Sequence, residues 1–426
     1  MRKLLLTTIL ASTLAVLGQT PERLTLAEAE EMALKRNPSI SAAQLSALAA
    51  RETPTQLNAA RYPALSAGFT GAGASENSRL AAGTFNNPII FSRVASGVSV
   101  NQLLLDFGRT TNLVSSAQQQ ALARHEDADA RRDAVVIEVD RAYFEALRAE
   151  AVVRVARQTV EARQIVVDQV EALAKARLKS GLDVSFANVS LAEAQLLVSS
   201  AENQRRAAYA RLSAALGLQT VQQFQLVEEP LPNVEPLVLS EFVQQALLKR
   251  HDLRARRLEA DAFQYSIKAE KAASLPSVSA VASAGWVPER NQQQLPGRYG
   301  AVGVVVNLPV LNGGLFKSRQ AEATLRARAA VEQGRELENQ IVREVAVALS
   351  DVNTASERLE LTARLLEQAG QALELAQARY DLGLSSIVEL SQAQLARTTA
   401  EIQNTNARYE YQVLRRTLAY HSGSIR

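Results

Sequence analysis

Leu24-Thr25-Leu26-Ala27-Glu28 recurs in this chain as Leu237-Val238-Leu239-Ser240-Glu241, at an offset of 213 residues (237 − 24). Two later motif pairs recur at shorter offsets. They are Leu105-Asp106-Phe107-Gly108 with Leu311-Asn312-Gly313-Gly314 (311 − 105 = 206), and Ala176–Gly181 with Ala378–Gly383 (378 − 176 = 202). Offsets that change only between motifs indicate loops of different length between the same elements. We therefore predict two structural repeats, residues 19–236 and 237–426, and because about three or more units are needed to close a repeat core alone, we expect other subunits to complete it.

The first residues are typical of a secretory signal peptide. Met1-Arg2-Lys3 is basic, and the apolar run from Leu4 to Leu17 is too short to cross a bilayer unaided. We expect cleavage after Gly18, so that residues 1–18 are removed. The chain has no Cys, which excludes disulfides, thiolate metal sites and lipoprotein processing. No later run reaches about 18 apolar residues, so any membrane part has to be a closed β-barrel.

Two long helices are predicted from segments with few helix breakers. Residues 107–178 hold no Pro and, after Gly108, no Gly. Apolar residues there form two seven-residue rows that only Arg163 interrupts, and the second copy repeats them. The four rows are Val139, Ala146, Val153, Val160, Val167, Ala174; Val135, Ala142, Ala149, Ala156, Arg163, Val170; Val345, Val352, Leu359, Leu366, Leu373, Tyr380; and Ile341, Ala348, Ala355, Thr362, Ala369, Ala376. This spacing indicates coiled-coil seams in helices of about 70 residues, each followed by a turn supplied by Gly181 or Gly383 and an antiparallel return helix.

Four short segments alternate apolar residues with small or polar ones, as a membrane strand does. They begin near Leu65, Val94, Val278 and Val302. The aromatic residues near the strand ends, expected to form a girdle, are Tyr62, Phe91, Trp286 and Tyr299. Four strands cannot close a barrel, because about eight is the small limit. The predicted fold is therefore mainly α with a membrane β part: long antiparallel coiled-coil helices in an α-barrel, plus four strands per chain in a trimeric 12-stranded β-barrel. Three subunits would also bury the helical seams. A soluble four-stranded sheet is the alternative.

Several motifs of this chain resemble the TolC-like family of bacterial outer-membrane efflux proteins, the outer membrane factors. They are Leu24–Ala29, Ala33–Pro38, the strand-to-helix joints Leu105–Arg109 and Leu308–Gly314, and the turn Ala378–Gly383. The resemblance covers essentially all of the mature chain. It implies a homotrimer with an outer-membrane barrel and a periplasmic helical tunnel, docked through a periplasmic adaptor (membrane fusion protein) onto an inner-membrane pump. Such a protein passively conducts substrates from the pump to the exterior of a Gram-negative bacterium.

The resemblance also assigns functions to the helical hairpin ends. In the family, residues at the second turn constrict and gate the tunnel mouth, and the matching positions here are Tyr380, Asp381, Ser385, Glu389 and Gln392. Tyr380 and Glu389 keep the family character. Ser385 stands where the best-known member has a bridging Arg, and Gln392 where it has an Asp, which implies fewer bridges and a weaker acidic ring. The resemblance implies that the adaptor contacts Gly181, Leu182, Gly383 and Leu384. From pattern alone, these residues are ordinary solvated hairpin ends.

Catalytic and metal-binding signatures are missing from the sequence. The three histidines, His125, His251 and His421, are far apart and lack metal-ligand spacing, and no phosphate-cradling loop or nucleophile elbow occurs. We therefore expect no enzymatic activity, cofactor or metal, and we expect His251 at a helix start or on the surface. The net charge of +3 arises from balanced charges, so no nucleic-acid partner is indicated. Two alternatives stay open: the outer-membrane component of type I protein secretion, and a periplasmic coiled-coil adaptor or structural protein.

Overall fold

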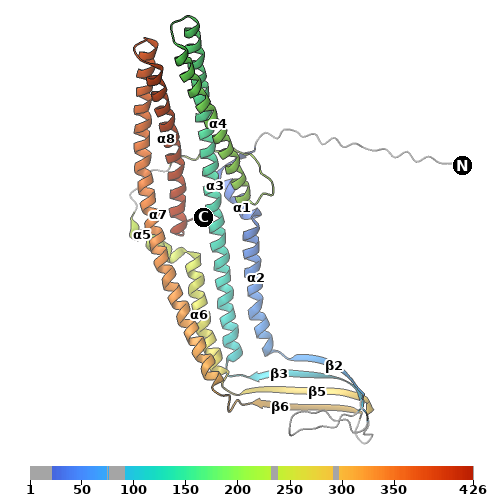
Figure 1. Ribbon diagram of the computed structural model, residues 1–426. Coiled ribbons are helices and arrows are strands. Elements are labelled where there is room, and N and C mark those ends of the chain that lie inside the picture. The colour runs from blue at the N-terminus through green and yellow to red at the C-terminus, as the bar shows by residue number, and fades with distance from the viewer. Residues whose placement is uncertain (1–21, 74, 76–91, 232–237, 291–296, 426) are drawn as a thin grey trace, which may run out of the picture. The chain divides into compact units, whose positions relative to one another are not determined.

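The computed structural model describes residues 22–73, 75, 92–231, 238–290 and 297–425 (Figure 1). Both halves of the chain use one order of elements: two shorter helices, two strands, a helix of 67 residues and a helix of 35 residues. The first half contains β1 (Arg23–Leu24), α1 (Leu26–Arg36), α2 (Pro38–Asn58), the 3-10 turn η1 (Ala59–Arg61), β2 (Ala64–Ala72), β3 (Arg93–Leu105), α3 (Arg109–Lys175), α4 (Gly181–Ala215) and β4 (Gln225–Leu226). The second contains α5 (Leu239–Lys249), α6 (His251–Ala272), β5 (Ser277–Arg290), β6 (Arg298–Asn307), α7 (Leu315–Asp381) and α8 (Ile387–His421). The predicted signal peptide and Phe91 lie outside the described residues.

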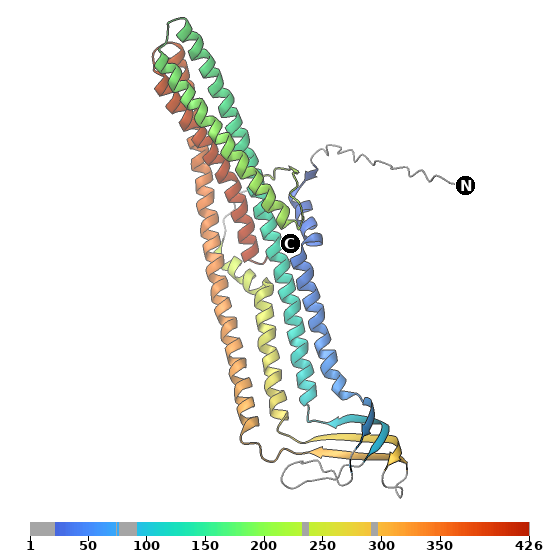
Figure 2. The same cartoon turned by 45° about the vertical axis from the view of Figure 1, so that its right-hand side comes forward.

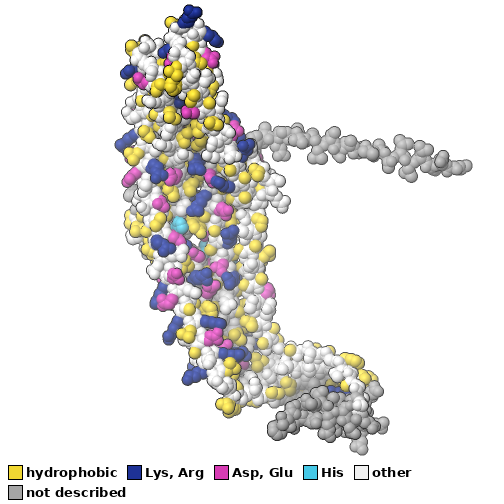
Figure 3. All heavy atoms as spheres, in the orientation of Figure 1, with side chains coloured by type: hydrophobic (Ala, Val, Ile, Leu, Met, Phe, Trp, Pro, Cys, Tyr) yellow, Lys and Arg dark blue, Asp and Glu magenta, His cyan; other side chains and the backbone are white. Residues whose placement is uncertain are grey.

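The chain divides into two compact units. We call residues 1–37, 135–236 and 351–416 the tip unit, because they include both helical hairpin ends. We call residues 38–134, 237–350 and 417–426 the sheet unit, because they include β2, β3, β5 and β6. Each unit therefore takes segments from both sequence repeats, and α3 and α7 each contribute residues to both units. Charged side chains of both signs are interspersed along the helices on the face drawn in Figure 3, as the balanced composition suggests.

In the tip unit, α3 with α4 and α7 with α8 form two helical hairpins (Figures 1 and 2). The predicted coiled-coil rows are largely buried there within one chain. Row members below 9% exposure include Val135, Val139, Ala146, Val153, Ala156, Val170, Val352, Ala355 and Tyr380. One hydrophobic cluster joins side chains from all four helices, with Val167, Leu191, Tyr380 and Leu390 among them. The expectation that other subunits bury these seams is therefore wrong for the tip unit, because the second hairpin of the same chain covers them.

A buried ionic network holds α1, α3 and α8 together in the tip unit. Asp140 is fully buried, and its carboxylate accepts a hydrogen bond of 2.5 Å from the Arg416 guanidinium. The same guanidinium pairs with Glu30. Burial and the neighbouring Asp140 carboxylate raise the pKa of Glu30 to about 7. One arginine thus faces two carboxylates, of which Glu30 takes up a proton near neutral pH.

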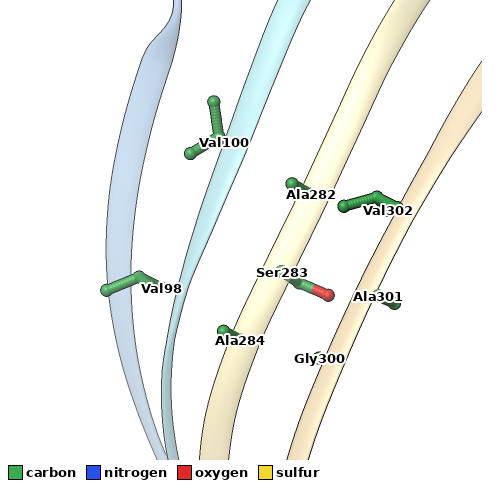
Figure 4. A pocket seen from close by; sticks show the side chains of 8 residues that line it. All are labelled: Val98, Val100, Ala282, Ser283, Ala284, Gly300, Ala301 and Val302. Carbon is green, nitrogen blue, oxygen red and sulfur yellow. The ribbon is translucent and has the colours of Figure 1, made fainter.

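In the sheet unit, four antiparallel strands pair in the order β2-β3-β5-β6. The register puts Leu65 opposite Val100, Val100 opposite Ala282, and Ala282 opposite Val302, so these apolar residues share one face. A shallow groove crosses this face, and Figure 4 shows that Ser283 and Ala301 point to the other side. Side chains on the apolar face stay exposed, with Val302 at 88%. The predicted alternation of an apolar face with a small or polar face is confirmed.

The opposite face carries a row of glycines on β2, β3 and β5, which Tyr299 continues on β6. Gly68 pairs with Gly97, Gly97 with Gly285, and Gly285 with Tyr299. A Cβ atom on Gly97 would lie only 2.5 Å from the Tyr299 hydroxyl, so this side chain lies over the glycine row. The prediction that Tyr299 belongs to one girdle with Trp286 is therefore wrong, because Trp286 pairs with Arg298 and points to the apolar face. None of the helices in the described part of the chain combines the length and the hydropathy of a transmembrane helix.

Candidate functional site at the hairpin tips

Both hairpins turn through the same backbone motif. At the second tip the amide of Leu384 donates to the Arg379 carbonyl (2.8 Å), and Gly383 between them has a left-handed φ of 74°. At the first tip the amide of Leu178 donates to the Leu173 carbonyl (2.9 Å), and the left-handed residue is Arg177, with φ of 60°. These bonds are those of a Schellman cap. The prediction that Gly181 supplies the first turn is therefore wrong, since Gly181 is the first residue of α4.

The tips align at a different offset from the one the sequence suggested. α3 and α7 begin at residues 109 and 315, and α4 and α8 at residues 181 and 387, so both pairs differ by 206 (315 − 109 and 387 − 181). Arg177 therefore corresponds to Gly383, Ser180 to Ser386, and Asp183 to Glu389. The offset of 202 at the tips is wrong, because it matched Ala176–Gly181 with Ala378–Gly383 by residue type, whereas the helix starts align at 206. Turn residues need not be glycine where the neighbouring hydrogen bonds impose the conformation.

Glu389 is the third residue of α8, and Ser386 is the residue that caps this helix. The backbone amide of Glu389 donates to the Ser386 hydroxyl (3.4 Å), as the amide of Asp183 does to Ser180 (3.2 Å). The Asp183 carboxylate completes a capping box, whereas the Glu389 carboxylate lies 3.3 Å from the Arg379 guanidinium. Both members of this ion pair are exposed enough for solvent to screen it, so the pair contributes little stability.

Tyr380 lies inside the tip unit rather than at its surface. Its side chain is 2% exposed and packs among Val170, Leu191 and Ile387, with the Lys179 ammonium 4.3 Å from the ring centre. Burial raises the pKa of the Tyr380 phenol. Within the described residues its hydroxyl has no hydrogen-bond partner, and neither does the buried hydroxyl of Ser385, a residue that is half-buried as a whole.

The other predicted gate residues face solvent. The Asp381 carboxylate accepts hydrogen bonds from Gln377 (3.0 Å) and Gln169 (3.3 Å), and Gln392 is exposed. The structure therefore brings Tyr380 and Ser385 to the inside of the second tip and leaves Asp381 and Gln392 outside.

The tips also expose leucines. Leu182 and Leu384, both predicted as adaptor contacts, are 65% and 67% exposed. Leu178 and Leu382 are more exposed still, at 71% and 74%, and the sequence analysis missed them. The sequence feature that could have identified them is an apolar residue inside a predicted turn, where polar residues are usual. Gly181 and Gly383 are also exposed, and a Cβ atom added to either would meet no other atom of the described residues within 4 Å.

Comparison with known proteins places this geometry in a family. The family model described as "Outer membrane efflux protein" matches residues 30–218 and 242–424. The chain belongs to this family. It is 28% identical to the outer membrane protein OprJ of Pseudomonas aeruginosa over 384 residues, which cover 87% of this chain and 78% of OprJ. It is 21% identical to the outer membrane protein TolC of Salmonella enteritidis, over 78% of this chain and 71% of TolC. The solved structure of the outer membrane protein VceC of Vibrio cholerae has the same fold, with a TM-score of 0.77 and 22% identity. The match covers 93% of this chain and 96% of VceC.

The chain is therefore an outer-membrane channel protein of an efflux system, located in the outer membrane of a Gram-negative bacterium. The predicted mainly α fold with a membrane β part is confirmed. The match favours the channel over the periplasmic adaptor considered above. The family and the similar structures are channel proteins.

Proposed function

We propose that three copies of this chain assemble into one duct, which receives substrates from an inner-membrane pump through a periplasmic adaptor and conducts them passively to the exterior. The observation that carries the proposal is the open sheet of the sheet unit. Within the described residues, β2 and β6 each pair with a strand on one side only. An unpaired strand edge in lipid leaves backbone groups without partners at several kcal/mol each, so the edges have to close.

Two copies would give eight strands, a closed barrel whose interior is filled by side chains, so three copies are the fewest that also leave a lumen for a duct. Pairing β2 of one copy with β6 of the next joins three four-stranded sheets into twelve strands, above the limit of about eight for a closed barrel. The exposed apolar face around Val302 then faces lipid, and the glycine row with Tyr299 faces the interior. The mass of the detergent-solubilised protein, corrected for bound detergent, tests this: we expect three chains. A stable monomer would refute the closure argument.

We further propose that the tips form the periplasmic mouth, gated by Tyr380, Asp381, Ser385, Glu389 and Gln392 and bound by the adaptor at Gly181, Leu182, Gly383 and Leu384. The exposed leucines at the hairpin turns support adaptor docking, because a partner that buries these side chains gains their transfer free energy from water. The Tyr380 ring, buried among apolar side chains from all four hairpin helices, supports a tightly packed constriction at the second tip.

Single-channel conductance in planar bilayers tests the gate. Tyr380→Ala removes a buried ring from the tip and should raise the resting conductance, whereas Tyr380→Phe keeps the ring and should change it little. Glu389→Gln should weaken block by added divalent cations, and Glu374→Gln, at an exposed position of α7, is the matched control. Unchanged conductance in Tyr380→Ala together with unchanged block in Glu389→Gln would leave these residues as ordinary hairpin ends.

The cargo distinguishes drug efflux from type I protein secretion. Deleting the gene and restoring it on a plasmid, then measuring both resistance to small toxic compounds and secretion of proteins, separates the two.

Co-purification of the cognate adaptor tests the docking surface. We expect Leu182→Ser and Leu384→Ser each to recover less adaptor than the wild-type protein does. Equal recovery from both variants and wild type would place the adaptor elsewhere.

A further inference from the structure

The sheet unit gathers carboxylates around the histidine that the sequence left unassigned. Glu126, Asp129 and Asp133 occupy successive turns along one face of α3, and His251 is the first residue of α6. The Nδ1 atom of His251 lies 2.7 Å from a Glu126 carboxylate oxygen and 4.0 Å from an Asp129 oxygen. One oxygen from each of these two carboxylates and one imidazole nitrogen lie within 4.8 Å of one another.

We propose that Glu126, Asp129 and His251 bind a divalent transition-metal ion of the zinc class, which ties α3 to the start of α6. Zinc takes imidazole nitrogen and carboxylate oxygen at about 2.0–2.2 Å, which puts tetrahedral ligands about 3.4 Å apart. The observed separations of 2.7 and 4.0 Å bracket this value, so small rotations of the side chains complete the ligand set. A water molecule takes the fourth position.

Asp133 supports this assignment from the other side of the ring. Its carboxylate lies 4.0 Å from the Nε2 atom of His251. When a metal occupies Nδ1, the proton of the imidazole is on Nε2 and points toward Asp133. A carboxylate behind a metal-bound histidine is the usual arrangement, because it fixes the tautomer and makes the ring a better ligand.

The local charge favours a cation. Three carboxylates surround His251, and one nearby guanidinium, that of Arg254, contacts Glu126 (3.5 Å). The positive charge of Arg250 is neutralised locally, because its guanidinium pairs with Asp252 and Glu344. Arg132 also contributes a positive field at Asp133, from an exposed side chain that water screens.

Arg254 competes with the metal. One of its nitrogens lies 3.3 Å from Nδ1 of His251, the atom that would bind the ion, while another donates to the Lys249 carbonyl (3.0 Å). The Nδ1 atom cannot at once donate to Glu126 and accept from Arg254; in the tautomer that leaves Nδ1 free to bind a metal, the proton is on Nε2 and Arg254 is the group that the ion displaces. Because the Arg254 side chain is 42% exposed, it can turn into solvent when the ion binds.

Zinc titration of the chelator-treated, detergent-purified full assembly tests the proposal, with a competing chromophoric chelator as the readout. We expect one ion per chain. His251→Gln and Glu126→Gln should each weaken binding at least about tenfold. His125→Gln is the matched control, since His125 lies exposed one residue before Glu126, and it should bind as wild type does. Arg254→Gln should bind more tightly than wild type, an outcome that a purely structural role of these residues does not predict.

Two further measurements keep the test decisive. Asp129→Asn alters the most exposed of the three ligands and serves if the other variants fail to assemble. X-ray absorption of the zinc-loaded protein should give only nitrogen and oxygen ligands at about 2.0–2.1 Å, with imidazole scattering that disappears in His251→Gln. Zinc affinity equal in wild type, His251→Gln and Asp129→Asn would overturn the site, and so would magnesium binding as tightly as zinc, because carboxylates alone would then suffice.

Discussion

Replacing Gly285 with Ala tests the packing of Tyr299 over the glycine row. A Cβ on Gly285 would lie 2.5 Å from the backbone carbonyl oxygen of Ser96 and would also meet the Tyr299 ring. Backbone cannot rotate away as a side chain can, so β3 and β5 have to separate locally. Such overpacking costs about 1–3 kcal/mol per chain, and we expect the upper part of this range.

Gly303→Ala is the matched control in the same sheet. A Cβ there meets only Val281, at an ordinary contact distance of 3.7 Å. Since alanine is favoured over glycine in a strand interior by about 0.5–1 kcal/mol, this variant should be neutral or slightly stabilising. The two substitutions add the same methyl group, so the difference between them isolates the close contact.

The assay is the temperature at which the detergent-solubilised assembly dissociates, followed on unheated gels, with circular dichroism for unfolding. Gly97→Ala adds an internal check, because its closest contact is the Tyr299 hydroxyl at 2.5 Å and the next is a carbonyl at 2.9 Å. Adding Tyr299→Ala should therefore restore part of the stability that Gly97→Ala loses, and a smaller part of the stability that Gly285→Ala loses. Equal stability of Gly285→Ala and Gly303→Ala would refute the assigned register and the position of Tyr299.

Three other predictions concern the tip unit. Val153→Asp puts an unpaired carboxylate into a buried row and should destabilise the folded chain itself by several kcal/mol, while exposed Glu161→Gln should leave its stability nearly unchanged. Thermal unfolding tests this, and a Val153→Asp variant as stable as Glu161→Gln and wild type would contradict it. Arg177→Gly should stabilise and Gly383→Ala should destabilise by about 1 kcal/mol each, because both positions have left-handed backbone; denaturant unfolding that ranks them the other way would exclude the shared turn. The raised pKa of Glu30 favours its protonated form in the folded state, so the wild-type protein loses stability as pH rises from 4.5 to about 7. The stability of Glu30→Gln relative to wild type should therefore increase over this window and stay constant above it. A stability difference that does not change with pH would disprove the pKa shift.

Local periodicity was enough to predict the two long helices and the four strands of the sheet unit. The seven-residue rows predicted two long helices, and α3 and α7 each run for 67 residues. Alternation predicted four strands with one apolar face, which the pairing of β2, β3, β5 and β6 confirms. These features depend on neighbours along the chain, and a single sequence contains that information.

Features that depend on partners distant in sequence could not be predicted. Alternation along β6 puts Tyr299 on the face opposite Val302, but its packing over Gly97 and Gly285 follows from the register between strands, which a single strand does not determine. The cluster around His251 needs Glu126, which lies 125 residues earlier. The left-handed turn at Arg177 is imposed by helix-capping hydrogen bonds, and residue type alone pointed to Gly181 instead.

The neighbours of Glu389 decide how strongly the proposed mouth can hold a cation. An isolated carboxylate repeated three times about an axis gives a ring of three negative charges, which attracts divalent ions. Here each Glu389 carboxylate lies beside an Arg379 guanidinium at 3.3 Å, so each charge of the ring has a positive neighbour in its own chain. Gln392, which lies one turn further along α8, adds no charge. A mouth built from these residues therefore closes mainly through the packing of Tyr380, which is buried among apolar side chains, and only weakly through cation binding.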